Sequence, residues 1–345
     1  MPTELSPDDR NFILRLTCGA GGLFAVGLVL GWPMAVVGAV FSALFLQGPA
    51  APPVKAALSL AFLSLWTMSL SFVLSSALAP YPVVFLAAIA IGIFLSYAWS
   101  LAGAGMLHGI LTLMAVLMVP NLVLQSPDLT LVLVTWVPLN LLIAAFTAML
   151  MFELFPAAPP QPGAAAAAPQ ASEFDRKRRM LRMSLVTVPF ALTFFVIDSS
   201  YILTLFFVAI LGQQLAAMPA AGPKVAKTML LANAMGAAFA IVSNELTVMA
   251  PVLITAMVLG VLVCLTLGSM MKSGKPSAAL AGSALSTFLI IYGGTIAPFA
   301  DDADTKAIDR ILQVGAACLF VILAYLVIDE FLPERQKSEK PAETA

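Results

Sequence analysis

The sequence RKRRMLRMSLVTVPFALTFFVI, residues 176–197, decides the fold class of this chain. It joins the basic run Arg176–Arg179 to an apolar stretch that is long enough to enter a lipid bilayer. Because positive charge resists translocation, such a run marks the cytoplasmic end of a membrane helix. The stretch therefore predicts a spanning helix that begins in the cytoplasm.

Apolar stretches recur along the whole chain. Hydrophobic residues make up 61% and charged residues 10% of the 345 residues, against about 45–50% and about 25% in soluble proteins. A spanning helix needs about 20 apolar residues. We expect an all-α polytopic membrane protein with about twelve transmembrane helices, at 11–30, 33–47, 54–79, 81–99, 101–119, 130–154, 180–197, 200–217, 223–243, 249–271, 276–298 and 308–331.

The seventeen Lys and Arg residues orient these segments. With the N-terminus in the cytoplasm, all of them except Lys306 and Arg310 fall on the cytoplasmic side. This bias predicts a multi-pass membrane protein with both termini in the cytoplasm. The lipid bilayer is its expected partner, and the chain has no basic face for nucleic acid.

The least certain division is 81–119, which carries no charge between Pro82 and His108. A single helix of that length, at 1.5 Å per residue, would be nearly twice as long as the roughly 30 Å hydrocarbon layer is thick. We therefore expect two helices joined near Ser100–Gly105.

The chain also repeats itself. A 167-residue offset separates Arg15 from Arg182, and the same offset separates Gln47 from Gln214. A Pro-rich inner loop follows each glutamine. Six crossings return the chain to the same side, so the two six-helix repeats are expected to be parallel, related by an axis along the membrane normal.

This organisation predicts four parts. The two six-helix repeats occupy 1–155 and 180–332, and a low-complexity, basic cytoplasmic linker at 156–179 joins them. A polar cytoplasmic tail follows at 333–345.

His108 is the single histidine, and it lies in the middle of an apolar segment. Ionisable groups inside membranes usually face a cavity or a proton path, and histidine titrates close to physiological pH. A proton-coupling role is one interpretation. The other is a neutral imidazole that bonds a backbone carbonyl between helices.

Four further candidates come in repeat-related pairs. Arg15 and Arg182 lie just inside their helices, where guanidinium groups could attract a carboxylate substrate or reach lipid phosphates. Gln47 and Gln214 end the second helix of each repeat. They line an entry to the pathway, or they only cap helix ends.

Asp198 lies at the outer end of the segment 180–197 and is a candidate proton-exchange carboxylate or a simple helix-end residue. The three cysteines, Cys18, Cys264 and Cys318, all lie in apolar segments and are expected to be small buried side chains. Their spacing predicts neither a disulfide framework nor a metal site. We expect no metal, no cofactor and no catalytic residue.

Nearly the whole chain, about 10–330, resembles the fusaric-acid-resistance and aromatic-acid-exporter superfamily, in particular its compact branch, domain of unknown function 2955. The resemblance rests on the order of short motifs: the helix with Arg15, the turn Gly31-Trp32-Pro33, the Pro-rich loop after Gln47, the stretch Arg179 to Arg182, Leu211-Gly-Gln-Gln, Asn233-Ala-Met-Gly236 and Arg310.

The resemblance implies an efflux component of the bacterial inner membrane that exports small, often aromatic, organic acids with the proton gradient. It also implies a periplasmic membrane-fusion adaptor as partner, while association of the protein with itself stays open. Two other functions remain possible at this point. One is a non-catalytic membrane anchor or assembly subunit, and the other is a membrane-embedded acyltransferase that uses His108 as general base.

Overall fold

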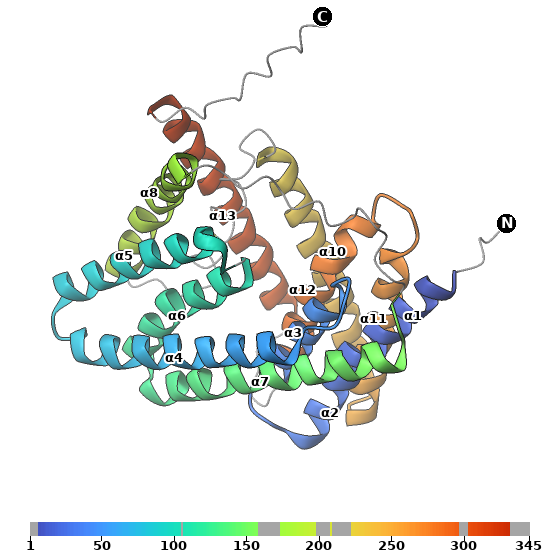
Figure 1. The fold of residues 1–345 in the computed structure, drawn as a ribbon. Coiled ribbons are helices and arrows are strands. Elements are labelled where there is room, and N and C mark those ends of the chain that lie inside the picture. Colours follow the sequence, from blue (N-terminus) through green and yellow to red (C-terminus); the bar gives the residue numbers. More distant parts are fainter. Residues whose placement is uncertain are drawn as a thin grey trace, which may run out of the picture.

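The computed structural model describes residues 6–104, 106–157, 173–197, 208, 222–296 and 303–331, and every regular element within them is a helix. Figure 1 shows their arrangement. The elements are α1 (Pro7–Leu16), the π-helical turn η1 (Thr17–Gly21), α2 (Gly22–Leu30), α3 (Ala35–Leu46), α4 (Val54–Leu78), α5 (Pro82–Trp99), the π-helical turn η2 (Ser100–Ala104), α6 (Met106–Gln125), α7 (Pro127–Leu154), α8 (Glu173–Ile197), α10 (Gly222–Met249), α11 (Leu253–Met271), α12 (Ala278–Ile296) and α13 (Ala303–Phe331).

Within the described residues, nine helices are long and apolar enough to cross a membrane. They are Pro7–Leu30, Val54–Leu78, Pro82–Ala102, Leu107–Gln125, Pro127–Leu154, Arg176–Val196, Lys227–Met249, Leu253–Met271 and Ala278–Ile296. The apolar parts of two further helices, Ala35–Leu46 and Leu312–Ile328, are shorter. This set of helices fits a multi-pass membrane protein. The predicted segment 200–217 lies almost wholly outside the described residues, so the count of twelve stays a prediction.

The helix boundaries follow local sequence signals. Ser6 caps α1 by accepting a hydrogen bond from the backbone N–H of Asp9, and Ser126 caps α7 in the same way. Proline stands in the first turn of α1, α5 and α7, where its missing N–H is not needed. These caps start α1 and α7 a few residues earlier than hydropathy predicts.

The long apolar stretch 81–119 divides as predicted. α5 ends at Trp99, η2 follows, and α6 begins at Met106. A second π-helical turn, η1, interrupts the predicted helix 11–30 between α1 and α2. Hydropathy does not reveal such a turn, because it changes the backbone hydrogen bonds and leaves the apolar character of the segment unaltered.

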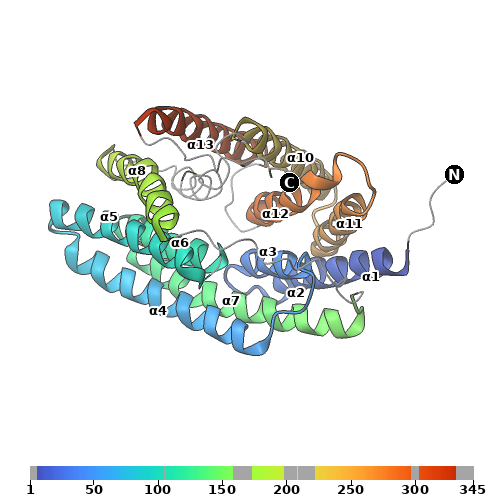
Figure 2. The same ribbon diagram turned by 45° about the horizontal axis from the view of Figure 1, so that its top comes forward.

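The helices pack in two groups. In the first half, α4 packs against α6 and α7, and Figure 1 shows α4 and α7 side by side. In the second half, α10 packs against α12 and α13. Figure 2 places α10 and α13 on the side of the molecule away from α4 and α7.

The two groups share their apolar cores. One cluster combines Ile93 and Tyr97 of α5 with Val186 of α8 and Val321 of α13. Another combines Leu16 and Phe24 with Phe288 and Tyr292 of α12. A third cluster lies within the first half, among α2, α3, α4, α6 and α7. Two of the three apolar cores are therefore built from side chains of both halves.

Small residues allow the closest crossings. A Cβ atom on Gly236 of α10 would collide with the backbone of α12 at Ala284 and would lie 2.8 Å from Cβ of Thr287. At the same crossing, Thr287 donates a hydrogen bond of 2.9 Å to the side chain of Asn233. Because lipid tails are as apolar as leucine, such close packing and interhelical hydrogen bonds hold membrane helices together.

Candidate functional site

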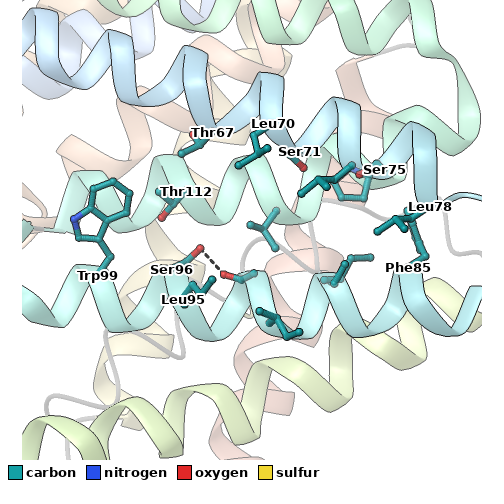
Figure 3. A pocket seen from close by; sticks show the side chains of 17 residues that line it. Thr67, Leu70, Ser71, Ser75, Leu78, Phe85, Leu95, Ser96, Trp99 and Thr112 are labelled. Atoms are coloured by element: carbon teal, nitrogen blue, oxygen red, sulfur yellow. Dashed lines mark hydrogen bonds between the residues drawn. The ribbon is translucent and has the colours of Figure 1, made fainter.

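A cavity with a volume of about 420 Å³ lies between α4, α5 and α6. Figure 3 shows the 17 side chains that line it. α4 and α5 contact each other much less than each contacts α6, whose residues Thr112, Val116 and Pro120 complete the pocket lining. We call this cavity the α4–α5–α6 pocket.

Apolar side chains form most of the pocket wall, and no lining side chain is charged. Five hydroxyl groups interrupt this wall: Thr67, Ser71, Ser75, Ser96 and Thr112. Three of them recur every fourth residue along α4 and so lie along one face of the helix. Figure 3 shows them across the pocket from Ser96 and Trp99 of α5.

Four of these hydroxyls already donate to backbone carbonyls. Thr67, Ser96 and Thr112 bond carbonyls of the preceding turn in their own helices. Ser71 donates across to the carbonyl of Ala115 in α6, at 2.7 Å. Ser75 is 5% exposed, and its hydroxyl makes no hydrogen bond within the described part of the chain.

The pocket opens sideways, through the gap between α4 and α5. Ile91 and Leu95 of α5 line it and are 60% and 59% exposed, and Leu70 and Leu74 of α4 are nearly half exposed. In a bilayer these side chains face lipid. The opening therefore gives access from the membrane interior.

His108 does not lie in the middle of its helix, where the predicted segment 101–119 placed it. It is the third residue of α6, directly after the η2 connection, and it is half-buried. Its backbone carbonyl accepts a hydrogen bond from the hydroxyl of Thr112, which lines the pocket. His108 thus lies one helical turn before Thr112, the first residue of α6 that lines the pocket.

Arg15 does not reach lipid phosphates. It is 3% exposed, and its guanidinium carbon lies 3.9 Å from the ring centroid of Phe152 in α7. Its Nη1 donates to the carbonyl of Phe155, the residue that ends α7, at 3.2 Å. One turn earlier, Asn11 donates to the carbonyl of Pro156. Arg15 therefore fastens α1 to the C-terminal end of α7.

Arg182 has a similar environment in the second half. It is 2% exposed, and its guanidinium carbon lies 5.6 Å from the ring centroid of Tyr325 in α13. Burial excludes the lipid-phosphate interpretation for this residue as well. Both arginines lie outside the α4–α5–α6 pocket.

Gln47 stands at the C-cap position of α3. Its backbone N–H bonds the carbonyl of Ala43, and its side chain lies against Gly282 of α12. Gln214 and Asp198 lie outside the described residues. Of the cysteines, Cys264 and Cys318 are buried as expected, whereas Cys18 is exposed, which corrects the expectation for that residue.

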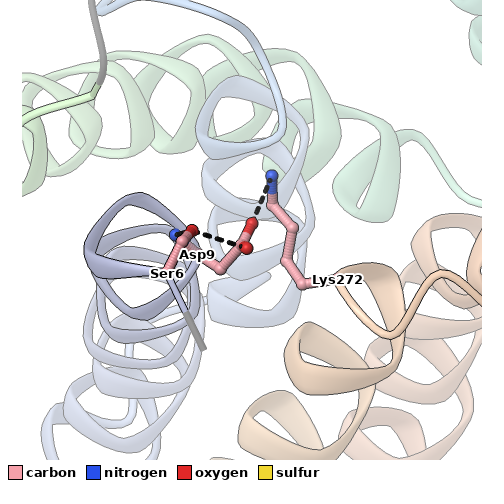
Figure 4. Close-up of polar contacts among 3 residues, drawn as sticks. All are labelled: Ser6, Asp9 and Lys272. Atoms are coloured by element: carbon pink, nitrogen blue, oxygen red, sulfur yellow. Dashed lines mark hydrogen bonds and ion pairs between the residues drawn. The ribbon is translucent and has the colours of Figure 1, made fainter. Parts of the chain in front are cut away.

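One ion pair joins the halves at the start of α1 (Figure 4). Asp9 Oδ1 lies 3.3 Å from Nζ of Lys272, the residue that follows α11. Ser6 donates to the other oxygen of Asp9, and the Lys272 ammonium lies 4.6 Å from the ring centroid of Phe12. Each ionic side chain of the pair is about one third exposed.

The sequence analysis missed the pocket because it searched for charged and titratable groups. One signal was available in the sequence: the hydroxyl residues Thr67, Ser71 and Ser75 recur at helical spacing in an otherwise apolar segment. That the facing helices leave room beside them cannot be read from the sequence, because the room depends on how α4 and α5 diverge.

Comparison with curated proteins and with solved structures found no match. A family model does match, from α1 to the end of α7, and this region contains the whole α4–α5–α6 pocket. The match supports the compact branch of the resemblance: residues 12–153 are similar to the family described as protein of unknown function, DUF2955.

Proposed function

We propose that this protein is a secondary transporter of the bacterial inner membrane that exports small, aromatic organic acids with the proton gradient. In this proposal two parallel six-helix repeats, with both chain ends in the cytoplasm, form the two halves of the transporter. The observation that carries the proposal is the correspondence of helix packing between the halves.

That correspondence extends through the described helices. α4 packs on α6 and α7 as α10 packs on α12 and α13. Between the halves, α5 packs on α8, the first helix of the second half. In the reciprocal contact, α11 packs on α1, η1 and α2, the first helical unit of the first half. An approximate twofold relation between the halves accounts for both contacts.

The arginines follow the same relation. Arg15 in the first helix of one half lies over Phe152 in the last helix of that half. Arg182 in the first helix of the other half lies over Tyr325 in its last helix. The matching contacts support two parallel repeats, an arrangement in which a substrate site between two halves can open to either side of the membrane.

The substrate class and the partner come from the resemblance to aromatic-acid exporters. A periplasmic membrane-fusion adaptor would complete the export route, and the protein could associate with itself. His108, at the end of the α4–α5–α6 pocket, is the candidate proton-coupling group within the described residues.

One observation favours a second candidate, a non-catalytic anchor or assembly subunit. The contacts of Arg15 fasten two helix ends: its Nη1 donates to the carbonyl of Phe155, and its guanidinium lies over the ring of Phe152. An acyltransferase that uses His108 has less support. The hydrogen bond described at His108 involves its backbone carbonyl and not its imidazole.

Flux into proteoliposomes tests the proposal. Purified protein should transport members of a panel of aromatic carboxylates, faster with an imposed pH gradient than without one. His108→Gln should remove the gradient dependence while the protein still inserts and folds. If the folded protein gives no flux across the panel, the transporter proposal is wrong and the anchor role gains support.

The ion pair between Asp9 and Lys272, which joins the two halves, provides a second test of the transporter proposal. In a Cys18→Ser background, Asp9→Cys and Lys272→Cys should be joined by a short, cleavable bis-maleimide. If the halves must move apart at this end, the crosslink should stop flux and cleavage should restore it. Single-cysteine variants treated with the same reagent serve as controls, and unchanged flux in the crosslinked protein would contradict alternating access at this contact.

A further inference from the structure

We propose that the α4–α5–α6 pocket binds a neutral, single-ring molecule that carries one hydrogen-bonding group and enters from the bilayer interior. The pocket would accept the undissociated form of an aromatic acid and exclude its anion. The binding site stands on the pocket geometry alone, whereas its role as the entry site for export rests on the proposed function.

The size of the pocket suits a small ligand. Its volume, about 420 Å³, lies near the lower end of the roughly 300–1,000 Å³ of small-molecule sites. Phe85 at one end and Trp99 at the other offer aromatic surfaces to a ring. A long acyl chain of a lipid would fill the same space. The polar groups that line the pocket therefore have to distinguish a single-ring ligand from an acyl chain.

The hydroxyl groups favour a ligand with a polar group. Ser75 lines the pocket, and its hydroxyl has no hydrogen-bond partner within the described residues. A ligand that covers this hydroxyl without bonding it would displace water from a polar group and give nothing in return. An acyl chain would leave it unpaired. A carboxylic acid, alcohol or phenol would accept from Ser75 or donate to it.

The other hydroxyls add acceptors. Thr67, Ser71 and Ser96 use their protons on backbone carbonyls, and each oxygen keeps a lone pair that can accept another bond. The pocket thus offers several acceptors together with the uncommitted hydroxyl of Ser75. This set complements the O–H and C=O groups of an undissociated carboxyl.

The uncharged lining of the pocket disfavours the ionised form of an aromatic acid. No side chain that lines the pocket is charged, and the two buried arginines lie elsewhere, against Phe152 and Tyr325. An ionised carboxylate in an apolar site without a counter-charge takes up a proton instead. The lateral opening between α4 and α5, where Ile91 and Leu95 are exposed, further favours a molecule that already partitions into the membrane.

Photolabelling of the full-length protein in nanodiscs tests this inference. Three probes with the same diazirine group should be compared: benzyl alcohol, toluene and benzenesulfonate. We expect the alcohol to label residues 67–99 and the permanently charged sulfonate not to. Benzoic acid should compete with the alcohol increasingly as the pH falls, because its undissociated fraction rises.

Matched variants locate the site. Ala88 lines the pocket, and its neighbour Ala87 is exposed and does not. Ala88→Phe should abolish labelling by the alcohol, and Ala87→Phe should leave it unchanged. Ser75→Ala should weaken the binding of the alcohol probe about fivefold, as expected for the loss of a hydrogen bond of about 1 kcal/mol. It should not affect toluene, and Ser76→Ala should affect neither probe.

Equal labelling by the sulfonate, or equal effects of Ala88→Phe and Ala87→Phe, would overturn the inference. The inference would also be overturned by two results found together: the alcohol labels nothing, and native mass spectrometry detects a bound phospholipid on the wild type but not on Ala88→Phe. Flux is read separately. Pocket labelling without flux would refute the transporter and keep the site, whereas flux that Ala88→Phe leaves intact would refute the entry role alone.

Discussion

At the scale of single residues, the two buried arginines show how a membrane protein accommodates charge. Arg15 keeps its guanidinium between an aromatic ring and the carbonyl that ends α7. The last carbonyls of a helix lack partners within the helix and carry partial negative charge, so a cation is favourable there. The sequence placed Arg15 correctly within its helix but could not show that the end of α7 lies beside it.

The contacts of Arg15 predict a role in stability. Arg15→Gln should lower the free energy of unfolding by about 1–3 kcal/mol, because a charged hydrogen bond and a ring contact are lost. Arg10 lies in the same helix but is exposed, so Arg10→Gln should change the free energy of unfolding by less than about 0.5 kcal/mol. Thermal melting in detergent measures both. If Arg15→Gln melts like the wild type and loses only flux, Arg15 binds substrate and is not a structural fastener.

At the scale of elements, helix positions were largely predictable, and so was the junction at η2, whereas the interruption at η1 was not. Hydropathy located α3, α4, α5 and α12 to within a few residues, because the apolar length of a segment is a property of the segment alone. The π-helical turn η1 depends on a neighbouring helix. For example, Gly21 in η1 lies where a Cβ atom would be 3.2 Å from the backbone of Val261 in α11.

The crossing of α10 and α12 predicts a contrast between two glycines. Gly236→Ala should destabilise the protein by about 1–3 kcal/mol, because the added methyl group collides with the backbone of α12. Gly22→Ala meets nothing within 4 Å, and should be neutral or stabilising by up to about 1 kcal/mol through helix propensity. Melting temperatures in detergent check the pair. Equal melting of the two variants would show that α12 shifts easily at this crossing.

At the scale of the whole molecule, the halves interlock through α5 with α8 and α11 with α1 and α2. Two clusters of buried side chains each draw residues from both halves. The two halves are therefore expected to fold as one unit in the membrane, with the α4–α5–α6 pocket on the lipid-facing side of the first half.

The orientation of the molecule is testable with two exposed turns. In a Cys18→Ser background, Tyr81→Cys in the turn between α4 and α5 should react with a membrane-impermeant maleimide in intact spheroplasts. Lys275→Cys, between α11 and α12, should react only after the cells are opened, because basic loops stay in the cytoplasm. The opposite pattern would reverse the topology and refute the cytoplasmic location of the chain ends.

The sequence by itself determined the membrane class, most helix positions and the division of the stretch 81–119. The reason is that the insertion of a segment into a bilayer depends on its own apolar length and on the basic residues beside it. It also picked out Arg15 and Arg182 as an equivalent pair. Only the tertiary structure decided that both arginines are buried against aromatic rings, that His108 lies at a helix start, and that an uncharged pocket opens between α4 and α5. These features depend on which helices meet and how closely, and that is settled by side-chain packing between segments far apart in the chain.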